Sequence, residues 1–154
     1  MIKVYLWNMT TSRWGHLSLE LSDGTYISFW PKETRGFKKA SLGTSYESDV
    51  KSEGSSADDI LELPDDIVDQ EEIKSWWKDY VLNNQYSLVF NNCAQVVKEA
   101  LVKGGIAKYM DEETTRAYVT ATTPLQVYVW AASCRRNYIV SQMETPSDKT
   151  CQLL

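Results

Sequence analysis

One stretch limits the possible folds of this chain more than any other. It is an extended run that ends at two asparagines and continues as an amphipathic helix. Residues 86–90 (YSLVF) alternate as in a β-strand, and Asn91 and Asn92 follow them. Asparagine is favoured just before a helix, because its side-chain oxygen accepts a backbone N–H at the helix start. Cys93 therefore begins a helix that we expect to end at Gly104. Its thiol then lies at the helix end where the dipole stabilises a thiolate.

His16, the one histidine of the chain, lies in a predicted hairpin whose strands are residues 15–21 and 26–30. Leucines alternate with polar residues in the first strand, as in a sheet with one apolar face. A three-residue turn with glycine at its end brings all the aliphatic side chains to one face. This register places Ser28 opposite Ser18, on the same face as His16. A thiol at a helix start and an imidazole on a strand are the parts that a thiol nucleophile needs.

The remaining elements follow from periodicity and from proline and glycine positions. We expect further strands at residues 2–7 and 58–63, and further helices at 69–82, 111–118 and 123–136. Residues 32–57 show little periodicity, and a segment of that length is typical of a functional lid or of disorder. The sequence therefore predicts one domain over residues 1–140, followed by a flexible polar tail over 141–154.

Composition limits the function classes. The net charge is −5, which gives no basic surface for nucleic acid. No apolar run reaches the length that crosses a bilayer, and the apolar stretch at residues 2–7 is too short for a signal peptide. We therefore expect a cytoplasmic protein with its three cysteines reduced. Three cysteines and one histidine give neither a disulfide framework nor a zinc site, and we expect no metal and no cofactor.

Two stretches resemble a known group. Residues 15–20 (GHLSLE) and the pattern Tyr86–x–Leu88–x–x–Asn91–Asn92–Cys93 resemble the circularly permuted NlpC-type papain-like hydrolases, in which the histidine strand precedes the cysteine helix. The nearest patterns are those of the lecithin retinol acyltransferase-like and PPPDE deubiquitinase-like families. Two positions depart from these families. Gln95–Val96 replaces the His–Phe or similar pair that often follows the cysteine, and Ser28 stands near the place of a second histidine.

The resemblance implies an α+β, permuted papain-like fold, with a small antiparallel sheet against helices and the cysteine at a helix N-terminus. It also implies a cysteine hydrolase or acyltransferase that attacks an amide, isopeptide or ester bond through a Cys93-acyl intermediate, with His16 as base. The substrate would be a peptide, an isopeptide or a lipid. Further roles are implied for flanking residues: the Cys93 N–H beside the Asn91–Asn92 cap as oxyanion donor, Ser28 or else Glu20 to orient the imidazole, and Trp14, Gly15 and Trp30 to line a substrate cleft.

Structural interpretations of the same residues stay open. A cysteine on the apolar stripe of a helix is typical of a core, and Ser18, Ser28 and Glu20 fit the outer polar face of a hairpin. The second functional hypothesis is accordingly a catalytically inactive papain-like module that binds a partner or a membrane.

The carboxyl terminus, Cys151–Gln152–Leu153–Leu154, matches a prenylation box, and its terminal leucine favours geranylgeranyl. The polar tail before it gives a prenyltransferase access to Cys151. Prenylation would place the protein peripherally on membranes, although one lipid chain alone holds a membrane only weakly.

Overall fold

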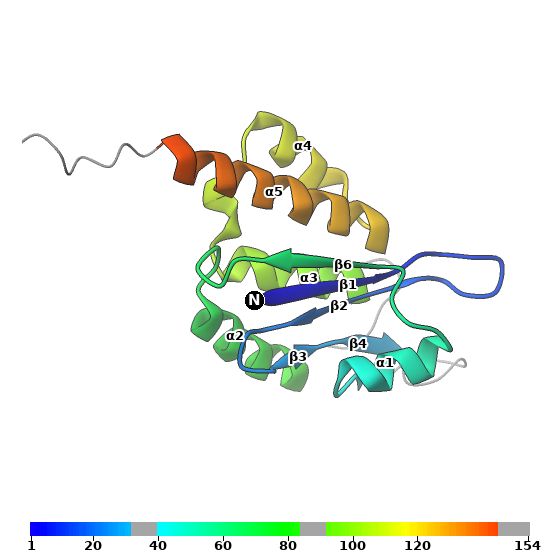
Figure 1. Ribbon diagram of the computed structural model, residues 1–154. Helices are drawn as coiled ribbons and strands as arrows, with labels where there is room; N and C mark the ends of the chain where they lie inside the picture. Colours follow the sequence, from blue (N-terminus) through cyan, green and yellow to red (C-terminus); the bar gives the residue numbers. More distant parts are fainter. Residues whose placement is uncertain (32–39, 84–91, 145–154) are drawn as a thin grey trace, which may run out of the picture.

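The amino-terminal part of the chain supplies the strands, and the carboxyl-terminal part supplies most of the helices (Figure 1). The computed structural model describes residues 1–31, 40–83 and 92–144. The strands are β1 (Ile2–Trp7), β2 (His16–Glu20), β3 (Tyr26–Ile27), β4 (Phe29–Pro31), β5 (Ala40–Leu42) and β6 (Asp59–Leu63). The helices are α1 (Tyr46–Glu53), α2 (Gln70–Asn83), α3 (Cys93–Lys103), α4 (Glu112–Thr120) and α5 (Pro124–Glu144), with a 3-10 turn η1 (Ile106–Tyr109). This arrangement confirms the predicted α+β class.

Four of the described strands form an antiparallel sheet in the order β3-β2-β1-β6, and β4 pairs with β5 in a separate two-stranded ladder. Leu19 faces Ile27 across β2 and β3, and the Leu21 N–H donates to the Thr25 carbonyl at 2.8 Å. This is the register that the three-residue turn predicts for the part of the hairpin next to the turn. The predicted strand 26–30 does not continue along β2, however, because it breaks at Ser28 and Phe29–Pro31 pair with β5 instead. The hairpin therefore has the faces that the alternation of leucines indicates.

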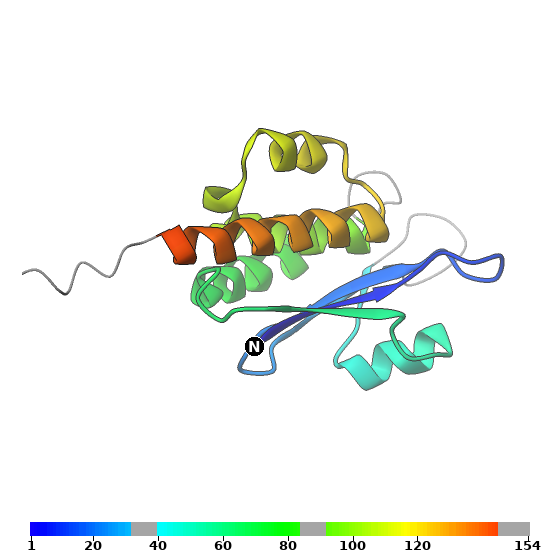
Figure 2. The ribbon, with the colours of Figure 1, turned by 45° about the horizontal axis from the view of Figure 1, so that its top comes forward.

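The helices α3 and α5 lie on one side of the sheet, whereas α1 lies on the other (Figures 1 and 2). The α3–α5 side holds the main core, to which the strands contribute aliphatic side chains that are almost fully buried. These include Ile2, Val4, Leu6, Leu17, Leu19, Ile27, Leu61 and Leu63. Burial of one such side chain stabilises the fold by roughly 1.5–3 kcal/mol. This core fixes β2 against α3, and with it the relative positions of the hairpin and the helix start.

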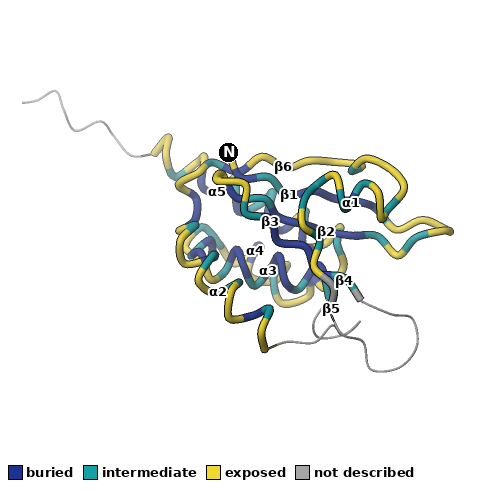
Figure 3. The backbone as a smooth tube through the Cα atoms, turned by 90° about the horizontal axis from the view of Figure 1, so that it is seen from below, coloured by how far each residue is buried: buried dark blue, intermediate teal, exposed yellow. Residues whose placement is uncertain are grey.

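The opposite face of the sheet also carries buried side chains, and β1 and β2 are coloured as buried over much of their length in Figure 3. Tyr5, Trp7 and Tyr26 form a smaller cluster there, against which Tyr46 and Val50 of α1 pack. His16, Ser18 and Ser28 lie on this face with exposures of 1%, 0% and 1%. The interpretation of Ser18 and Ser28 as an outer polar face is therefore wrong, because α1 covers them, whereas Glu20 on the same face is half-buried.

The helix α1 lies in the segment that lacks sequence periodicity. Ser45 caps it, accepting from the Ser48 N–H at 3.1 Å, and Gly54 ends it at φ 78°. The prediction of disorder is consequently wrong for Tyr46–Glu53, whereas the alternative of a functional lid stays a prediction. The pattern is weak because α1 has only eight residues and only Tyr46 and Val50 are apolar among them.

The later helices follow the predictions with one difference. The helices α2 and α4 lie within about two residues of their expected ranges, and α5 begins at Pro124 as expected. However, α5 continues to Glu144, four residues into the predicted tail. Tyr138 explains this, because its ring packs on Tyr109 at 5.0 Å and its hydroxyl donates to Asp66 at 2.7 Å.

Three predictions fall outside the described residues: the strand at 86–90, the Asn91 position, and the tail from residue 145 onward. None of the helices in the described ranges has the length and apolar character that a membrane span requires.

Candidate active site

His16 begins β2 and contacts two tryptophan rings on the α1 face of the sheet. Its ring stacks on Trp30 with centroids 4.0 Å apart and is tilted against Trp7 at 5.6 Å. Gly15, just before it, has a φ of 82°, and a Cβ there would lie 2.9 Å from the Trp7 carbonyl oxygen. Glycine thus lets the chain pass close to β1, which places the imidazole of His16 between Trp7 and Trp30.

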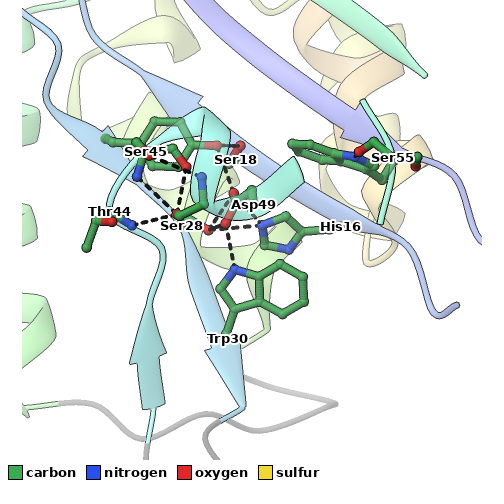
Figure 4. A network of polar contacts seen from close by, with 11 residues as sticks. His16, Ser18, Ser28, Trp30, Thr44, Ser45, Asp49 and Ser55 are labelled. Carbon is green, nitrogen blue, oxygen red and sulfur yellow. Dashed lines mark hydrogen bonds and ion pairs between the residues drawn. The ribbon is translucent and has the colours of Figure 1, made fainter. Parts of the chain in front are cut away.

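The side chain of Asp49, which comes from α1, contacts the imidazole of His16 (Figure 4). The Asp49 carboxylate is fully buried, and its Oδ2 atom lies 3.0 Å from Nε2 of His16. Three more side chains donate to it. Oδ2 accepts from the Tyr26 hydroxyl at 2.7 Å and from Ser28 at 2.8 Å, and Oδ1 accepts from Nε1 of Trp30 at 2.8 Å. Burial raises the pKa of Asp49, but the bonds from His16, Tyr26 and Trp30 outweigh burial and lower it.

These contacts fix the position of the His16 proton. An ionised carboxylate only accepts, so Tyr26 and Ser28 each give their single hydroxyl proton to Asp49. Ser28 Oγ lies 3.0 Å from Nε2 of His16 and has no second proton to give, so it accepts there. Nε2 therefore carries a proton, which Asp49 and Ser28 both accept. The second ring nitrogen, Nδ1, is left to exchange a proton elsewhere.

Gly43 makes the close approach of Ser28 and Asp49 sterically possible. Its N–H donates to the Ser28 carbonyl at 3.1 Å. A Cβ at residue 43 would overlap Ser28 and the Asp49 carboxylate. Any side chain at this position would push apart the two groups that hold Nε2 of His16.

Cys93 is the first residue of α3, as predicted. The Asn92 side chain caps the helix by accepting from the Gln95 N–H at 2.9 Å. By helix geometry, the N–H groups of Cys93 and Ala94 have no acceptor within the helix, and the dipole adds positive character there. The helix packs against β2 and β4, which carry His16 and Trp30. Cys93 is 7% exposed.

His16 lies close enough to Cys93 for the thiol to affect its pKa. Burial lowers the pKa of His16, but hydrogen bonds to Asp49 and Cys93, together with the charges of both groups, raise it to about 9. His16 is therefore an imidazolium at neutral pH, held between a carboxylate and a thiol. Because Asp49 and Ser28 occupy Nε2, Nδ1 is the ring nitrogen that is left for the thiol.

The other predicted site residues lie at varied distances from this centre. Ser28 touches His16 as expected, but it also donates to Asp49. Glu20 lies at the far end of β2, where it accepts from the Tyr5 hydroxyl at 3.3 Å; the carboxylate on His16 is that of Asp49 instead. Trp30 stacks on the imidazole, whereas Trp14 is 86% exposed. Asn91 and the proposed lipidation site Cys151 lie outside the described residues.

Sequence analysis does not identify Asp49. The available signal is the pair Ser45 and Ser48, spaced as in a capping box, with Asp49 directly after it. That pattern indicates a helix start but gives no direction for the carboxylate. Within the described ranges, no group of three or more His, Cys, Asp or Glu side chains is arranged to hold a metal ion.

Comparison with family models, with curated proteins and with solved structures found no match to this chain. The function is therefore inferred from the surroundings of Cys93, His16 and Asp49.

Proposed function

We propose that the protein is a thiol-dependent hydrolase or acyltransferase of the permuted papain-like type, with Cys93 as nucleophile, His16 as base and Asp49 as the residue that orients the base. The observation that carries the proposal is that one ring nitrogen of His16 is held by a buried carboxylate while its ring interacts with a cysteine at a helix start. A nucleophile, a base and a third group that orients the base are the parts of a covalent acyl-transfer site.

The chain order supports the same proposal. The His16 strand precedes the Cys93 helix, as in the permuted hydrolases that the sequence resembles, and Asp49 lies between them in the sequence. The α+β arrangement with an antiparallel sheet and the cysteine at a helix N-terminus agrees with that fold type.

The reaction would begin from an ion pair in which the Cys93 proton already lies on Nδ1 of His16, because His16 is an imidazolium at neutral pH. The thiolate attacks the substrate carbonyl carbon, a C–S bond forms, and the carbonyl π electrons move to oxygen. The N–H groups of Cys93 and Ala94 at the start of α3 are the donors for that oxyanion. Asp49 stabilises the imidazolium through Nε2 and keeps Nδ1 directed at the reacting atoms.

The acyl-enzyme forms when the oxyanion collapses. The bond to the leaving nitrogen or oxygen breaks, and Nδ1–H of His16 gives its proton to that leaving group. Water, or an acceptor hydroxyl or amine, then attacks the thioester and gives a proton to His16. A second collapse releases the acyl product and frees the Cys93 thiolate beside the protonated His16, which restores the starting ion pair. Amide, isopeptide and ester substrates, on a peptide or a lipid, share the acyl carbon on which these groups act.

One observation favours a different candidate function, that of a catalytically inactive binding module. Cys93 and His16 are 7% and 1% exposed, so the pair is largely covered by the protein. In that case Asp49 and His16 form a structural ion pair that ties α1 to the sheet.

An activated ester separates the two functions without knowledge of the natural substrate. The protein is incubated with p-nitrophenyl acetate, quenched in acid and analysed by intact and peptide mass. We expect an acetyl group on Cys93, absent in Cys93→Ala and strongly reduced in His16→Ala and Asp49→Asn. Acetylation that is no faster in the wild type than in the folded His16→Ala variant would favour the binding module.

A further inference from the structure

Tyr26 occupies a place in the polar network that the proposed reaction does not use. It is 8% exposed on β3, and its hydroxyl lies 2.7 Å from Oδ2 of Asp49 and 2.7 Å from Oγ of Ser18. Oδ2 is also the atom that binds Nε2 of His16 at 3.0 Å. Tyr26 and His16 thus share one carboxylate oxygen.

The direction of each hydrogen bond follows from counting protons. Tyr26 has one hydroxyl proton, and Asp49 as a carboxylate only accepts, so this proton points to Asp49. Ser18, which is fully buried, therefore donates to the Tyr26 oxygen. Burial raises the pKa of Tyr26 well above its ordinary value, so the phenol keeps its proton. The chain of donors runs from Ser18 to Tyr26 to Asp49.

We propose that Tyr26 is a positioning residue for the candidate site: its hydroxyl, oriented by Ser18, keeps the buried Asp49 ionised and fixes Oδ2 where it holds His16. The inference rests on the proposed function. A buried carboxylate that lacks donors takes up a proton more readily. A neutral Asp49 would no longer stabilise the imidazolium, and the thiolate of Cys93 would lose its counterion.

The charged groups around this network come from several elements. Glu53 of α1 interacts with His16, Asp49 and Asp58, and Arg13 offsets its charge from the β1–β2 loop. Tyr5 of β1, with Glu20 and Glu47 near it, lies on the far side of Tyr26. The titratable groups that face Asp49 and His16 are accordingly Cys93, Tyr26 and Glu53, with Arg13 beside Glu53 and Tyr5 beyond Tyr26.

The test is the pH profile of Cys93 alkylation by iodoacetamide, measured on the full chain by peptide mass. The pH is varied from 4 to 9, which roughly spans the ordinary pKa values of carboxyl and imidazole groups. Tyr26→Phe keeps the ring and removes the hydroxyl. Tyr5→Phe is the matched control, because Tyr5 is 4% exposed in the same aromatic cluster but donates to Glu20 instead. We expect Tyr26→Phe to move the acidic limb of the profile to higher pH by about one unit, a tenfold change in proton affinity. Tyr5→Phe should leave the limb in place.

Ser18→Ala provides a second variant that keeps the test valid if Tyr26→Phe does not fold. It removes the donor that orients Tyr26, and we expect a smaller shift in the same direction. A limb that stays at the wild-type pH in the folded variants would overturn the role of Tyr26. A wild-type Cys93 that shows no acidic limb and reacts like N-acetylcysteine would instead overturn the proposed function itself.

Discussion

Nε2 of His16 lies 3.0 Å from Oδ2 of Asp49, a residue 33 positions further along the chain. The two side chains are 1% and 0% exposed, and they join the second strand of the sheet to a short helix on its less aliphatic face. A buried ion pair of this kind adds little net stability, because desolvation offsets the attraction between the charges. Loss of one partner alone is costly, however, since it leaves an unpaired charge in the interior. The pair therefore fixes geometry, and the following predictions test that geometry.

The two described cysteines should differ sharply in reactivity. Cys134 is fully buried in α5, and burial, with the nearby Asp111 charge, raises the pKa of its thiol to about 12. Cys93 has an imidazolium beside it and a helix dipole behind it, both of which favour a thiolate. We expect iodoacetamide at pH 7 to label Cys93 at least about tenfold faster than Cys134. His16→Ala should remove most of this advantage, as read by peptide mass.

Burial alone could also protect Cys134, so the His16 dependence is the decisive part of that comparison. The control is Lys108→Ala, at an exposed position in η1, which leaves the site intact. Equal labelling of Cys93 in the wild type and in a folded His16→Ala variant would contradict the pairing of the two side chains.

Gly43→Ala should damage the site through sterics alone. The added Cβ overlaps Ser28 and the Asp49 carboxylate. Overpacking of a buried site costs roughly 1–3 kcal/mol, and we expect this loss in urea unfolding together with a severalfold slower alkylation of Cys93. Ser52→Ala on the exposed side of α1 serves as control. Wild-type stability and reactivity in Gly43→Ala would mean that Ser28 and Asp49 are further from residue 43 than the structure has them.

The hairpin and the start of α3 could be predicted because their signals are local. Alternating leucines fix the faces of β2, and Asn92 before an apolar stripe fixes the position of Cys93. The register then brings Ser28 toward His16 without any long-range information. This is why the sequence predicts Cys93 and His16 as site residues and Ser28 as a residue that contacts His16.

Asp49 could not be predicted because its role depends on tertiary packing. Its helix is short and mostly polar, and it lies in a segment without a clear period. Only the docking of Tyr46 and Val50 on Tyr5 and Trp7 turns the carboxylate toward His16. The same packing buries Ser18 and Ser28, which alternation alone assigns to an exposed face. Alternation also places Glu20 on the same face as His16, which made it a candidate to orient the imidazole. The two residues lie at opposite ends of β2, however.

The carboxyl-terminal box gives a separate prediction about location. If Cys151 carries a geranylgeranyl chain, burial of the chain contributes about 0.8 kcal/mol per CH₂ group, enough for reversible membrane residence. The net charge of −5 would not add attraction to anionic lipids. We expect Cys151→Ser to move the protein to the soluble fraction of a eukaryotic cell, with Cys93 reactivity unchanged. Cys93→Ala is the matched control and should stay with the membranes. A wild-type protein of unmodified mass in the soluble fraction would reject the box.

The pH dependence of stability should carry the signature of His16. Its pKa rises from 6.5 to about 9 on folding, so the folded state binds the His16 proton more tightly than the unfolded state does. This pH-dependent contribution is fully present below about pH 6.5 and is lost as the pH rises through about 9. Urea unfolding at intervals across this range measures it. His16→Gln should be less stable than the wild type near pH 6, and the difference should shrink toward pH 9.5.

Because His16 is the one histidine of the chain, its ¹⁵N imidazole signals also report the proton directly. We expect both nitrogens to be protonated at pH 7, and Nε2 to keep its proton above the pKa. A neutral ring at pH 7, with a flat stability profile, would contradict the ion pair with Asp49.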